Sequence, residues 1–364
     1  APVGALQNMP AMIMSDTKEK RFRNANTLNY DFKKIMGEDH HLTALVGQES
    51  INYTSNALTN TIHGYPTFFD FDQAKKLTTQ GTPQSVDNYY SPDDKLLSFF
   101  GRANYDYKNR YILSATFRAD GSSKFSEQNR WGYFPAFAAG WKISEENFLK
   151  DKSWLSLLKV RASYGEAGNN NIPVGQQIQI FQSTATSWIN GITSVWAPSK
   201  TMPNPDLKWE TTVTQNFGLD FGFFKNRLSG NFDIYKNITS DLLINFPVAG
   251  SGYDFQYRNM GETQNTGFEA TLNVVAIEKA KYGLNFSFNM SVNKNRINSL
   301  GVMNDFGAAT GWASSQIGDD YLISVGSSLG TMYGYKNDGR YEVSDFDYVA
   351  GKYVLKSGVV NTAT

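Results

Sequence analysis

Apolar and polar residues alternate through residues 110–125, RYILSATFRADGSSKF, until a polar run ends the pattern. In an extended strand this alternation divides the side chains between two faces, with Tyr111, Leu113, Ala115 and Phe117 on one face and Ser114, Thr116 and Arg118 on the other. A period of two predicts a β-strand whose faces have different surroundings. In a soluble sheet the apolar face meets a core and the polar face meets water. In a membrane barrel the apolar face meets lipid and the polar face lines a lumen.

The preceding segment, residues 97–107, alternates in the same way and predicts a hairpin across the link 108–110. If Tyr107 pairs with Tyr111, both strands keep their apolar residues on one face, as a single register requires. Further hairpins of this kind are predicted from the paired segments 22–32 and 41–50, 217–223 and 228–234, and 268–274 and 282–288.

The connections between predicted strands alternate between short and long. The short connections are 108–110, 224–227 and 275–281, with a medium one near 145–157 that offers the one candidate for an amphipathic helix. The long polar connections are 52–95, 120–130, 166–210, 237–262 and 293–330. Tight turns at one end of a sheet and long loops at the other are typical of outer-membrane barrels, whose turns are periplasmic and whose loops are extracellular.

The polar face carries charges that could not form a dry core, because burying an unpaired polar group costs about 2–7 kcal/mol. These residues are expected to form a lumen-facing charged wall, and they are Arg102, Arg118, Asp120, Asp220, Asp233 and Glu269. The opposite face is nearly free of charge, and lipid is its simplest cover. Tyr105, Tyr107 and Tyr111 lie beside a short turn, as the aromatic girdle of a membrane barrel would, although aromatic residues also favour strands in general.

Composition narrows the class further. The 364 residues include 14% aromatic side chains, balanced charges (34 Lys and Arg, 34 Asp and Glu) and no Cys. Balanced charge argues against a nucleic-acid surface, and the absence of Cys excludes disulfides and thiolate metal sites. No stretch approaches the roughly 20 apolar residues of a spanning helix. The first ten residues lack signal-peptide features, so we expect either a mature chain or one that begins inside a longer protein.

Several motifs resemble the SusC/RagA family of TonB-dependent outer-membrane transporters of Bacteroidota. They follow the family's order over most of residues 97–346, and they are FFGRANYDYKNRYILSATFRADGSSKF, NRWGYFPAFAAGWKISEENF, LKVRASYGEAGNNNI, NPDLKWETTVTQNFGLDFGFFKNRLSGNFDIYKNITSDLL, NMGETQNTGFEATLN and GTMYGYKNDGRYEVSDF. The resemblance implies an all-β fold, a transmembrane antiparallel β-barrel of 22 strands with an N-terminal plug domain. Residues 1–364 are expected to supply about twelve of these strands, without the plug or the last barrel strands.

The resemblance also implies a location in the outer membrane and import of oligosaccharides or peptides. The implied partners are a SusD-like surface lipoprotein that acts as a lid, TonB acting through the plug, the lipid and the cargo. A passive porin-type barrel and a β-rich surface glycan-binding or adhesin module are the alternatives that the residues leave open.

We predict no catalytic or metal site and no cofactor. His40 and His41 form the only His pair, and a solvated turn explains them better than a metal centre, which would need further ligands. Adjacent carboxylates occur at 93–94, 145–146 and 319–320, each in a polar connection that favours solvation or helix capping.

The segment RADGSSKF has two interpretations. Arg118, Asp120 and Lys124 could contact substrate at the outer mouth of a barrel. The favoured alternative is a strand exit, in which Asp120-Gly121 forms a turn and Arg118 and Arg102 join charge pairs in the lumen.

The best candidates for cargo contact are aromatic residues in the long connections, because sugar rings and peptides both stack on flat apolar faces. Loop packing or contact with the lipoprotein would explain the same residues. The candidates are Trp188, Trp196, Tyr253 and Trp312.

Overall fold

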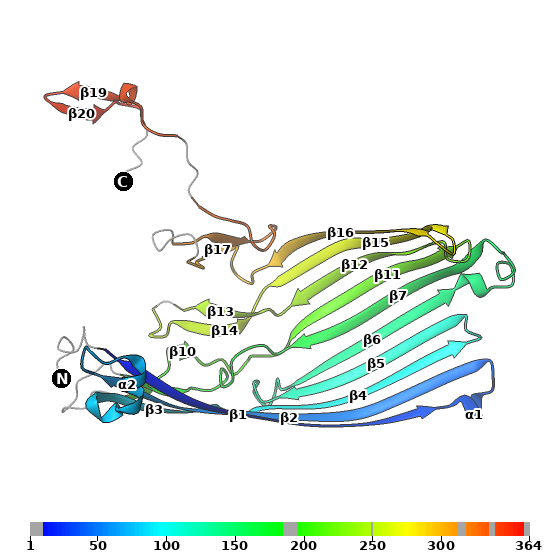
Figure 1. The fold of residues 1–364 in the computed structure, drawn as a ribbon, viewed down its shortest axis with the longest axis horizontal. Coiled ribbons are helices and arrows are strands. Elements are labelled where there is room, and N and C mark those ends of the chain that lie inside the picture. Colours follow the sequence, from blue (N-terminus) through cyan, green and yellow to red (C-terminus); the bar gives the residue numbers. More distant parts are fainter. Residues whose placement is uncertain (1–9, 185–194, 249, 312–317, 335–338, 360–364) are drawn as a thin grey trace.

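One large antiparallel sheet dominates the computed structural model, which describes residues 10–184, 195–248, 250–311, 318–334 and 339–359. The sheet has eleven strands in the order β1-β2-β4-β5-β6-β7-β11-β12-β15-β16, and β3 also pairs with β2. It curves into an open trough with long strands lying side by side (Figure 1). The fold class predicted from the alternating pattern is therefore confirmed.

The strands of the large sheet are β1 (Met12–Asp31), β2 (His40–His63), β3 (Thr82–Tyr90), β4 (Asp94–Tyr107), β5 (Tyr111–Ser122), β6 (Trp131–Lys142), β7 (Leu155–Asn169), β11 (Glu210–Phe223), β12 (Leu228–Ser240), β15 (Glu262–Glu278) and β16 (Gly283–Ser299). The described residues also form smaller sheets. In one of them β14 (Phe255–Asn259) lies between β10 (Thr201–Met202) and β13 (Leu243–Pro247). The others are two-stranded and pair β8 (Phe181–Thr184) with β9 (Val195–Pro198), β17 (Asp305–Ala308) with β18 (Tyr321–Ser324), and β19 (Phe346–Val349) with β20 (Lys352–Leu355).

Helical segments in the described part of the chain are short. They are the α-helices α1 (Lys33–Met36) and α2 (Phe71–Lys76) and the 3₁₀ turns η1 (Thr78–Gln80), η2 (Ile143–Glu145) and η3 (Val343–Asp345). Within the described ranges, no helix has the length and apolar character needed to cross a membrane.

The register predicted for the first hairpin is confirmed residue by residue, since Tyr107 pairs with Tyr111 and Gly101 with Phe117. The hairpin of β11 and β12 also has the expected register, with Phe223 opposite Leu228. Two of the tightest turns rely on left-handed backbone. In the 108–110 link, Lys108 and Asn109 have φ values of 56° and 54°, as the two central residues of a turn that follows the twist of the strands, and Arg110 N donates to Tyr107 O (2.9 Å). In the 224–227 link, Phe224, Lys225 and Asn226 have φ values of 54°, 58° and 61°.

Three predicted boundaries are wrong. Residues 52–95 are not only a polar loop, because β2 runs to His63 and β3 pairs along its end. Residues 145–157 do not form an amphipathic helix, because 146–154 form successive turns, with Leu149 N donating to Glu146 O (2.8 Å), and β7 begins at Leu155. The β15–β16 turn is shorter than 275–281 because both strands extend toward it past a register shift between Val275 and Ile277.

The shortest connections lie at one end of the sheet and the longest at the other, as expected, although 143–154 at the first end is longer than 123–130 at the second. We call the end with the short connections the turn end, and its connections are 32–39, 108–110, 143–154, 224–227 and 279–282. The opposite end is the loop end, and its connections are 64–93, 123–130, 170–209 and 241–261.

Aromatic residues flank the apolar band at both ends of the sheet. On the outer surface Trp131 of β6 stacks with Phe99 (centroids 6.2 Å apart) near the loop end, and Trp141 stacks with Tyr111 (6.5 Å) near the turn end. For a rise of about 3.3 Å per residue and a tilt of about 40° from the axis of a barrel, the strand from Trp131 to Trp141 spans about 25 Å along that axis. This separation matches the apolar band of a membrane barrel, about 25 Å tall.

A small hydrophobic core fills the concave side at the loop end. Its buried members come from β6 and from two connections, 123–130 and 170–209, and they are Phe125, Phe134, Ile172, Leu207 and Trp209. The indole of Trp209 lies 5.4 Å from the ring of Phe125 and donates from Nε1 to Arg130 O (2.9 Å). The connections at this end are thus packed against one another and against the wall.

Candidate functional site

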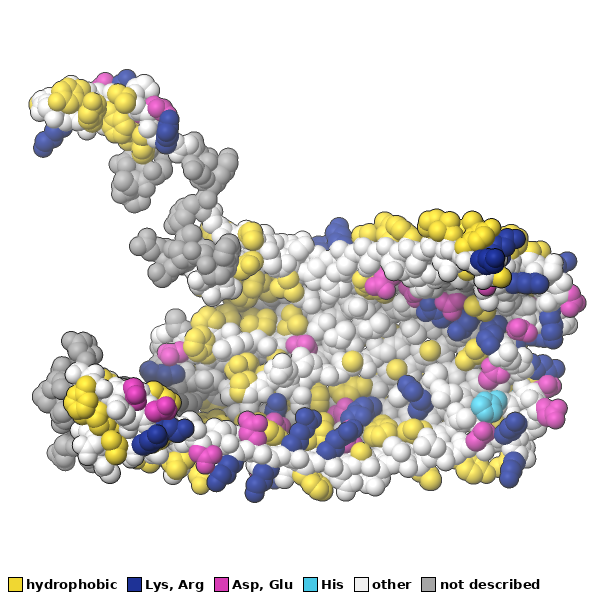
Figure 2. Space-filling model, in the orientation of Figure 1, with side chains coloured by type: hydrophobic (Ala, Val, Ile, Leu, Met, Phe, Trp, Pro, Cys, Tyr) yellow, Lys and Arg dark blue, Asp and Glu magenta, His cyan; other side chains and the backbone are white. Residues whose placement is uncertain are grey.

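The concave face of the trough is lined by polar and charged side chains, and the convex face is apolar. Pairing places Thr116 and Ser114 of β5 on the same face as Arg102 and Asn104 of β4. Figure 2 shows Lys, Arg, Asp and Glu side chains within the hollow, with apolar side chains along the outside of β15 and β16. On the convex face Leu113 and Phe117 each expose about half of their surface (50% and 51%). An apolar surface of this extent needs cover from lipid or from another protein layer.

Arg118 of β5 is the centre of the first charged cluster on the concave face. Its Nε donates to both carboxylate oxygens of Asp120 (2.8 Å each), and its terminal nitrogen donates to Ser98 Oγ (2.9 Å) and Glu49 Oε2 (3.4 Å). Arg23 of β1 also binds Glu49. The two carboxylate side chains are only 10–12% exposed, so the guanidinium groups balance charge that water reaches poorly.

Arg161 of β7 forms a second cluster of the same kind. Its Nε donates to both oxygens of Asp220 (3.0 Å each), and its terminal nitrogen donates to Asp233 Oδ2 (2.9 Å). Asn231 Nδ2 also donates to Asp233 (3.0 Å). Gly218 makes room for this cluster, because a Cβ there would lie 2.6 Å from the Arg161 guanidinium. Each arginine therefore joins strands that are distant in sequence.

Two other residues of the predicted wall have different surroundings. Arg102 donates to Thr116 Oγ1 (3.1 Å), so its described partner is a hydroxyl and not the carboxylate of a charge pair. Glu269 is exposed and lies opposite Asp233 in the pairing of β12 with β15. The predicted wall is brought together on one face, but its ion pairs concentrate on Arg118 and Arg161.

The first half of the segment DGSSKF, Asp120 to Ser122, is part of the wall and not a turn. β5 continues to Ser122, and Asp120 is buried beside Arg118. Gly121 serves close packing, because a Cβ there would lie 3.0 Å from the ring of Trp131. The turn predicted at Asp120-Gly121 is therefore wrong, because contact with a neighbouring strand, and not local turn chemistry, explains this glycine.

The strand exit comes three residues later, and Lys124 faces the loop-end connections. Its Nζ lies 3.8 Å from Asp94 Oδ2 and 3.5 Å from Asn170 O. Asn170 also donates to Ser122 Oγ (3.0 Å). These contacts give the segment RADGSSKF a structural role at the end of β5. The sequence predicts a strand exit here but not the residues that Lys124 contacts.

Of the four aromatic residues predicted to contact cargo, the structure describes Tyr253 in full. Its hydroxyl donates to Gln179 Oε1 (2.8 Å) and joins two long connections of the loop end. Trp188 and Trp312 lie outside the described residues, and for Trp196 the structure places only its backbone in β9. Contact with cargo stays a prediction for all four.

The carboxylate pair Glu145-Glu146 is explained by contacts at the turn end. Glu146 accepts hydrogen bonds from Tyr111 OH (2.6 Å), Trp141 Nε1 (3.0 Å) and Arg110 (2.9 Å). These partners hold the pKa of Glu146 below its usual range, with the bond from Tyr111 as the largest cause. The carboxylate thus stays ionised at neutral pH and fixes two aromatic residues of the outer surface.

The histidines have structural partners as well. His40 Nδ1 lies 2.7 Å from Tyr105 OH, and His41 Nε2 lies 3.4 Å from Asp31 Oδ2. Across the residues that the structure describes, no group of three or more His, Cys, Asp or Glu could hold a metal ion.

Replacing Arg118 with Met is expected to destabilise the folded protein by about 2–3 kcal/mol. Removing one partner of a buried ion pair costs about 3–5 kcal/mol, and the loss is smaller here because a third of the Arg118 side chain is exposed. Denaturant unfolding of the complete protein in lipid vesicles measures the change. Arg102→Met is the matched control, with an expected loss below about 0.5 kcal/mol, and equal losses for the two variants would contradict the assignment.

Comparison with known proteins is consistent with this architecture. Residues 10–362 match the family described as TonB dependent receptor-like, beta-barrel. The chain is 35% identical over 330 residues to TonB-dependent receptor P39 of Formosa agariphila, covering 89% of this chain and 30% of that protein. It is 40% identical over 272 residues to TonB-dependent receptor SusC of Bacteroides thetaiotaomicron, covering 73% and 25%. The chain thus spans about a third or less of the length of these relatives.

Among solved structures, the chain is similar to the RagAB peptide transporter. The TM-score is 0.74 and the sequence identity 27%, over 87% of this chain and 34% of that one. The outer membrane transporter YddB of Escherichia coli shares the fold, with a TM-score of 0.51 at 14% identity.

Proposed function

The chain belongs to the TonB-dependent receptor-like β-barrel family, and from this premise we propose that it forms part of the wall of an outer-membrane transporter that imports nutrients with energy relayed by TonB. We place the turn end toward the periplasm and the loop end toward the outside of the cell, because outer-membrane barrels have short periplasmic turns and long extracellular loops. The chain provides scaffold and lumen surface, and no bond chemistry is assigned to it.

The polar lining of the concave face carries the proposal. The Arg118 and Arg161 clusters fix charged groups on a surface that water can reach, while Leu113, Phe117 and their neighbours cover the opposite face. A wall with these two faces separates a hydrated passage from lipid. Arg118 and Arg161 each form ion pairs with carboxylates of the same wall. The polar lining is therefore ordered before a solute arrives.

For the cargo we propose oligosaccharides or peptides, taken up beneath a SusD-like lipoprotein lid. Similarity to the RagAB peptide transporter supports a peptide, and similarity to SusC supports membership of the same branch of the family. Tyr253 at the loop end could stack on either class of cargo. Trp188 and Trp196 of the 170–209 connection, and Trp312 in the segment that follows β16, are proposed as further contacts.

Uptake measurements in cells test the transport proposal. A strain lacking the gene is compared with a complemented strain, using fluorescent oligosaccharide and peptide pools. Uptake is expected to need both this gene and an intact TonB system, and to fall to background when either is removed. Uptake that persists without TonB would favour the passive porin-type barrel instead.

Purification from native membranes tests the lid and the third candidate. A SusD-like lipoprotein is expected to co-purify with the complete transporter at a one-to-one ratio, as measured by mass spectrometry. A surface glycan-binding or adhesin module would be released without detergent, and that result would overturn the membrane assignment.

A further inference from the structure

We propose that a groove on the outer face of strands β4 to β7, together with basic residues of the turn end, binds an anionic phospholipid of the membrane leaflet at that end. The proposal rests on the placement of the wall in a membrane, which is part of the proposed function. It does not depend on the cargo.

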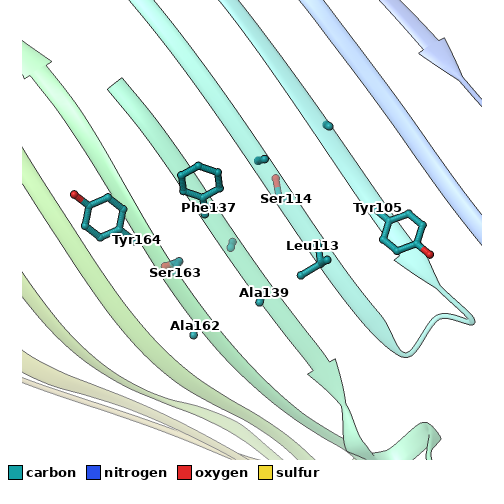
Figure 3. A pocket seen from close by; sticks show the side chains of 11 residues that line it. Tyr105, Leu113, Ser114, Phe137, Ala139, Ala162, Ser163 and Tyr164 are labelled. Atoms are coloured by element: carbon teal, nitrogen blue, oxygen red, sulfur yellow. The ribbon is translucent and has the colours of Figure 1, made fainter. Parts of the chain in front are cut away.

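The groove is an apolar hollow of about 560 Å³ whose floor is made of small side chains. The pairing of strands aligns Tyr105, Leu113, Ala139 and Ala162 in one row, and Ala103, Ala115, Phe137 and Tyr164 in the next row toward the loop end. Figure 3 shows Leu113, Ala139 and Ala162 across neighbouring strands, with the rings of Phe137 and Tyr164 on the side away from the turns. A flexible hydrocarbon chain suits a hollow of this lining and position, since it lies within the apolar band.

A row of stacked aromatic rings borders the groove on the side of the turns. Tyr107 stacks with Tyr111 (centroids 6.3 Å apart), and Tyr111 stacks with Trp141 (6.5 Å). Glu146 fixes the last two by accepting hydrogen bonds from both. Rings held at this height mark the boundary between acyl chains and headgroups, so a chain in the groove would place its headgroup at the 108–110 turn.

Charge favours an anionic headgroup at this end. The turn-end connections contain ten Lys or Arg and five Asp or Glu, whereas the loop-end connections contain seven and eight, in a chain whose charges balance. An excess of positive charge beside a bilayer attracts anionic lipid, with about 1 kcal/mol for each basic residue at the surface.

Lys108 is the basic residue best placed for the phosphate. Its ammonium lies 5.3 Å above the ring of Tyr107, at the edge of the groove, and 3.3 Å from Asp39 Oδ2. The hydrogen bond with Asp39 is the main reason that the pKa of Lys108 is raised, so the group stays charged at neutral pH. An ammonium has three donors, and the exposed side chain can offer one to a phosphate while another binds Asp39. Lys150 and Lys152 are exposed in the neighbouring 143–154 connection.

Native mass spectrometry of the complete, delipidated transporter tests the site. The protein is mixed with equal amounts of phosphatidylglycerol and phosphatidylcholine in micelles, and the lipids retained are counted. Wild-type protein is expected to retain phosphatidylglycerol in preference to phosphatidylcholine. Lys108→Gln should reduce that preference about fivefold, and Ala139→Phe should lower retention of both lipids several-fold by filling the groove.

Two matched controls separate the site from general effects. Lys225 has the same left-handed backbone in another tight turn (φ 58°), and Ala270 lies on the outer face of β15, in the row with Phe232. Lys225→Gln removes the same charge from a turn away from the groove and should lower the preference much less than Lys108→Gln does, and Ala270→Phe is expected to retain lipid as wild type does. Equal retention of the two lipids by wild-type protein, or equal losses in test and control variants, would overturn the proposal. Lipid counting needs no transport, so a failure of the transport proposal would be recognised separately.

Discussion

Replacing Phe125 with Ala is expected to destabilise the loop end by about 3–5 kcal/mol, the range for removing a buried phenyl ring from a packed core. Phe125 has no exposed surface. Its ring contacts the indole of Trp209, and Ile172 and Leu207 from the same 170–209 connection complete the cluster. A cavity at this point would loosen the contact between the 123–130 and 170–209 connections, and with the partly buried Leu243 and Tyr257 of the 241–261 connection. The loss should therefore appear first as local opening of the loop end and not as unfolding of the wall.

Limited proteolysis and denaturant unfolding of the complete protein distinguish these two levels. Phe125→Ala should speed cleavage within the 170–209 connection by more than tenfold while the strands stay protected. Phe68→Ala, in another loop-end connection, removes a ring that is 79% exposed and should change stability by less than about 0.5 kcal/mol. If both variants resist protease as wild type does, the cluster does not hold the loop end together.

The course of the sheet could be predicted because each strand carries its own register signal. A shift of one residue would move Tyr111 and Leu113 to the polar face, so alternation alone selects the pairing. Alternation also predicts that Arg118 and Asp220 lie on the polar face, and the pairing of their strands places both there. Local alternation therefore determines both the neighbours within a hairpin and the face of each side chain.

The partners of those charges could not be predicted from alternation. Arg118 and Glu49 are separated by 69 residues, and Arg161 and Asp233 by 72. Their contact depends on β2 lying beside β4, and on β11 lying between β7 and β12. Alternation gives the face of a residue but not the order of strands that are joined by long connections.

The loop-end core was missed for a related reason. Phe125 ends a polar segment, and Trp209 follows a Pro-rich one, so neither shows an apolar period. One signal in the sequence pointed to this core. Phe125 is a large aromatic residue that follows Gly121 and Ser122, and it has no apolar partner in its own segment. The residue types Asp120-Gly121 favour a turn. In the structure both residues stay in β5 instead, where Gly121 packs against the ring of Trp131.

The assignment of the two faces leads to a second large effect, since neighbouring residues on β5 should respond oppositely to the same charge. Ala115→Arg is expected to destabilise the protein by about 2–4 kcal/mol, because Ala115 lies on the convex face in the middle of the apolar band, where a charge in lipid costs this amount. Ser114→Arg should cost less than about 1 kcal/mol, because Ser114 lies on the polar face opposite Asn104 of β4, to which its hydroxyl donates (2.8 Å). There the guanidinium can reach water.

Folding of the complete transporter into phosphatidylcholine vesicles, followed by denaturant titration, measures both changes. The two variants add the same side chain one residue apart, so strand propensity and net charge are matched and only the surroundings differ. A protein layer over the convex face would make Ala115→Arg costly too. In that case the protein would stay folded in detergent-free solution and the cost would be measurable there, whereas a membrane wall cannot stay folded without lipid or detergent. A small and equal cost at both positions would mean that water reaches both faces. Only a large difference between the two positions, seen in lipid, agrees with a wall that separates a hydrated lumen from the bilayer.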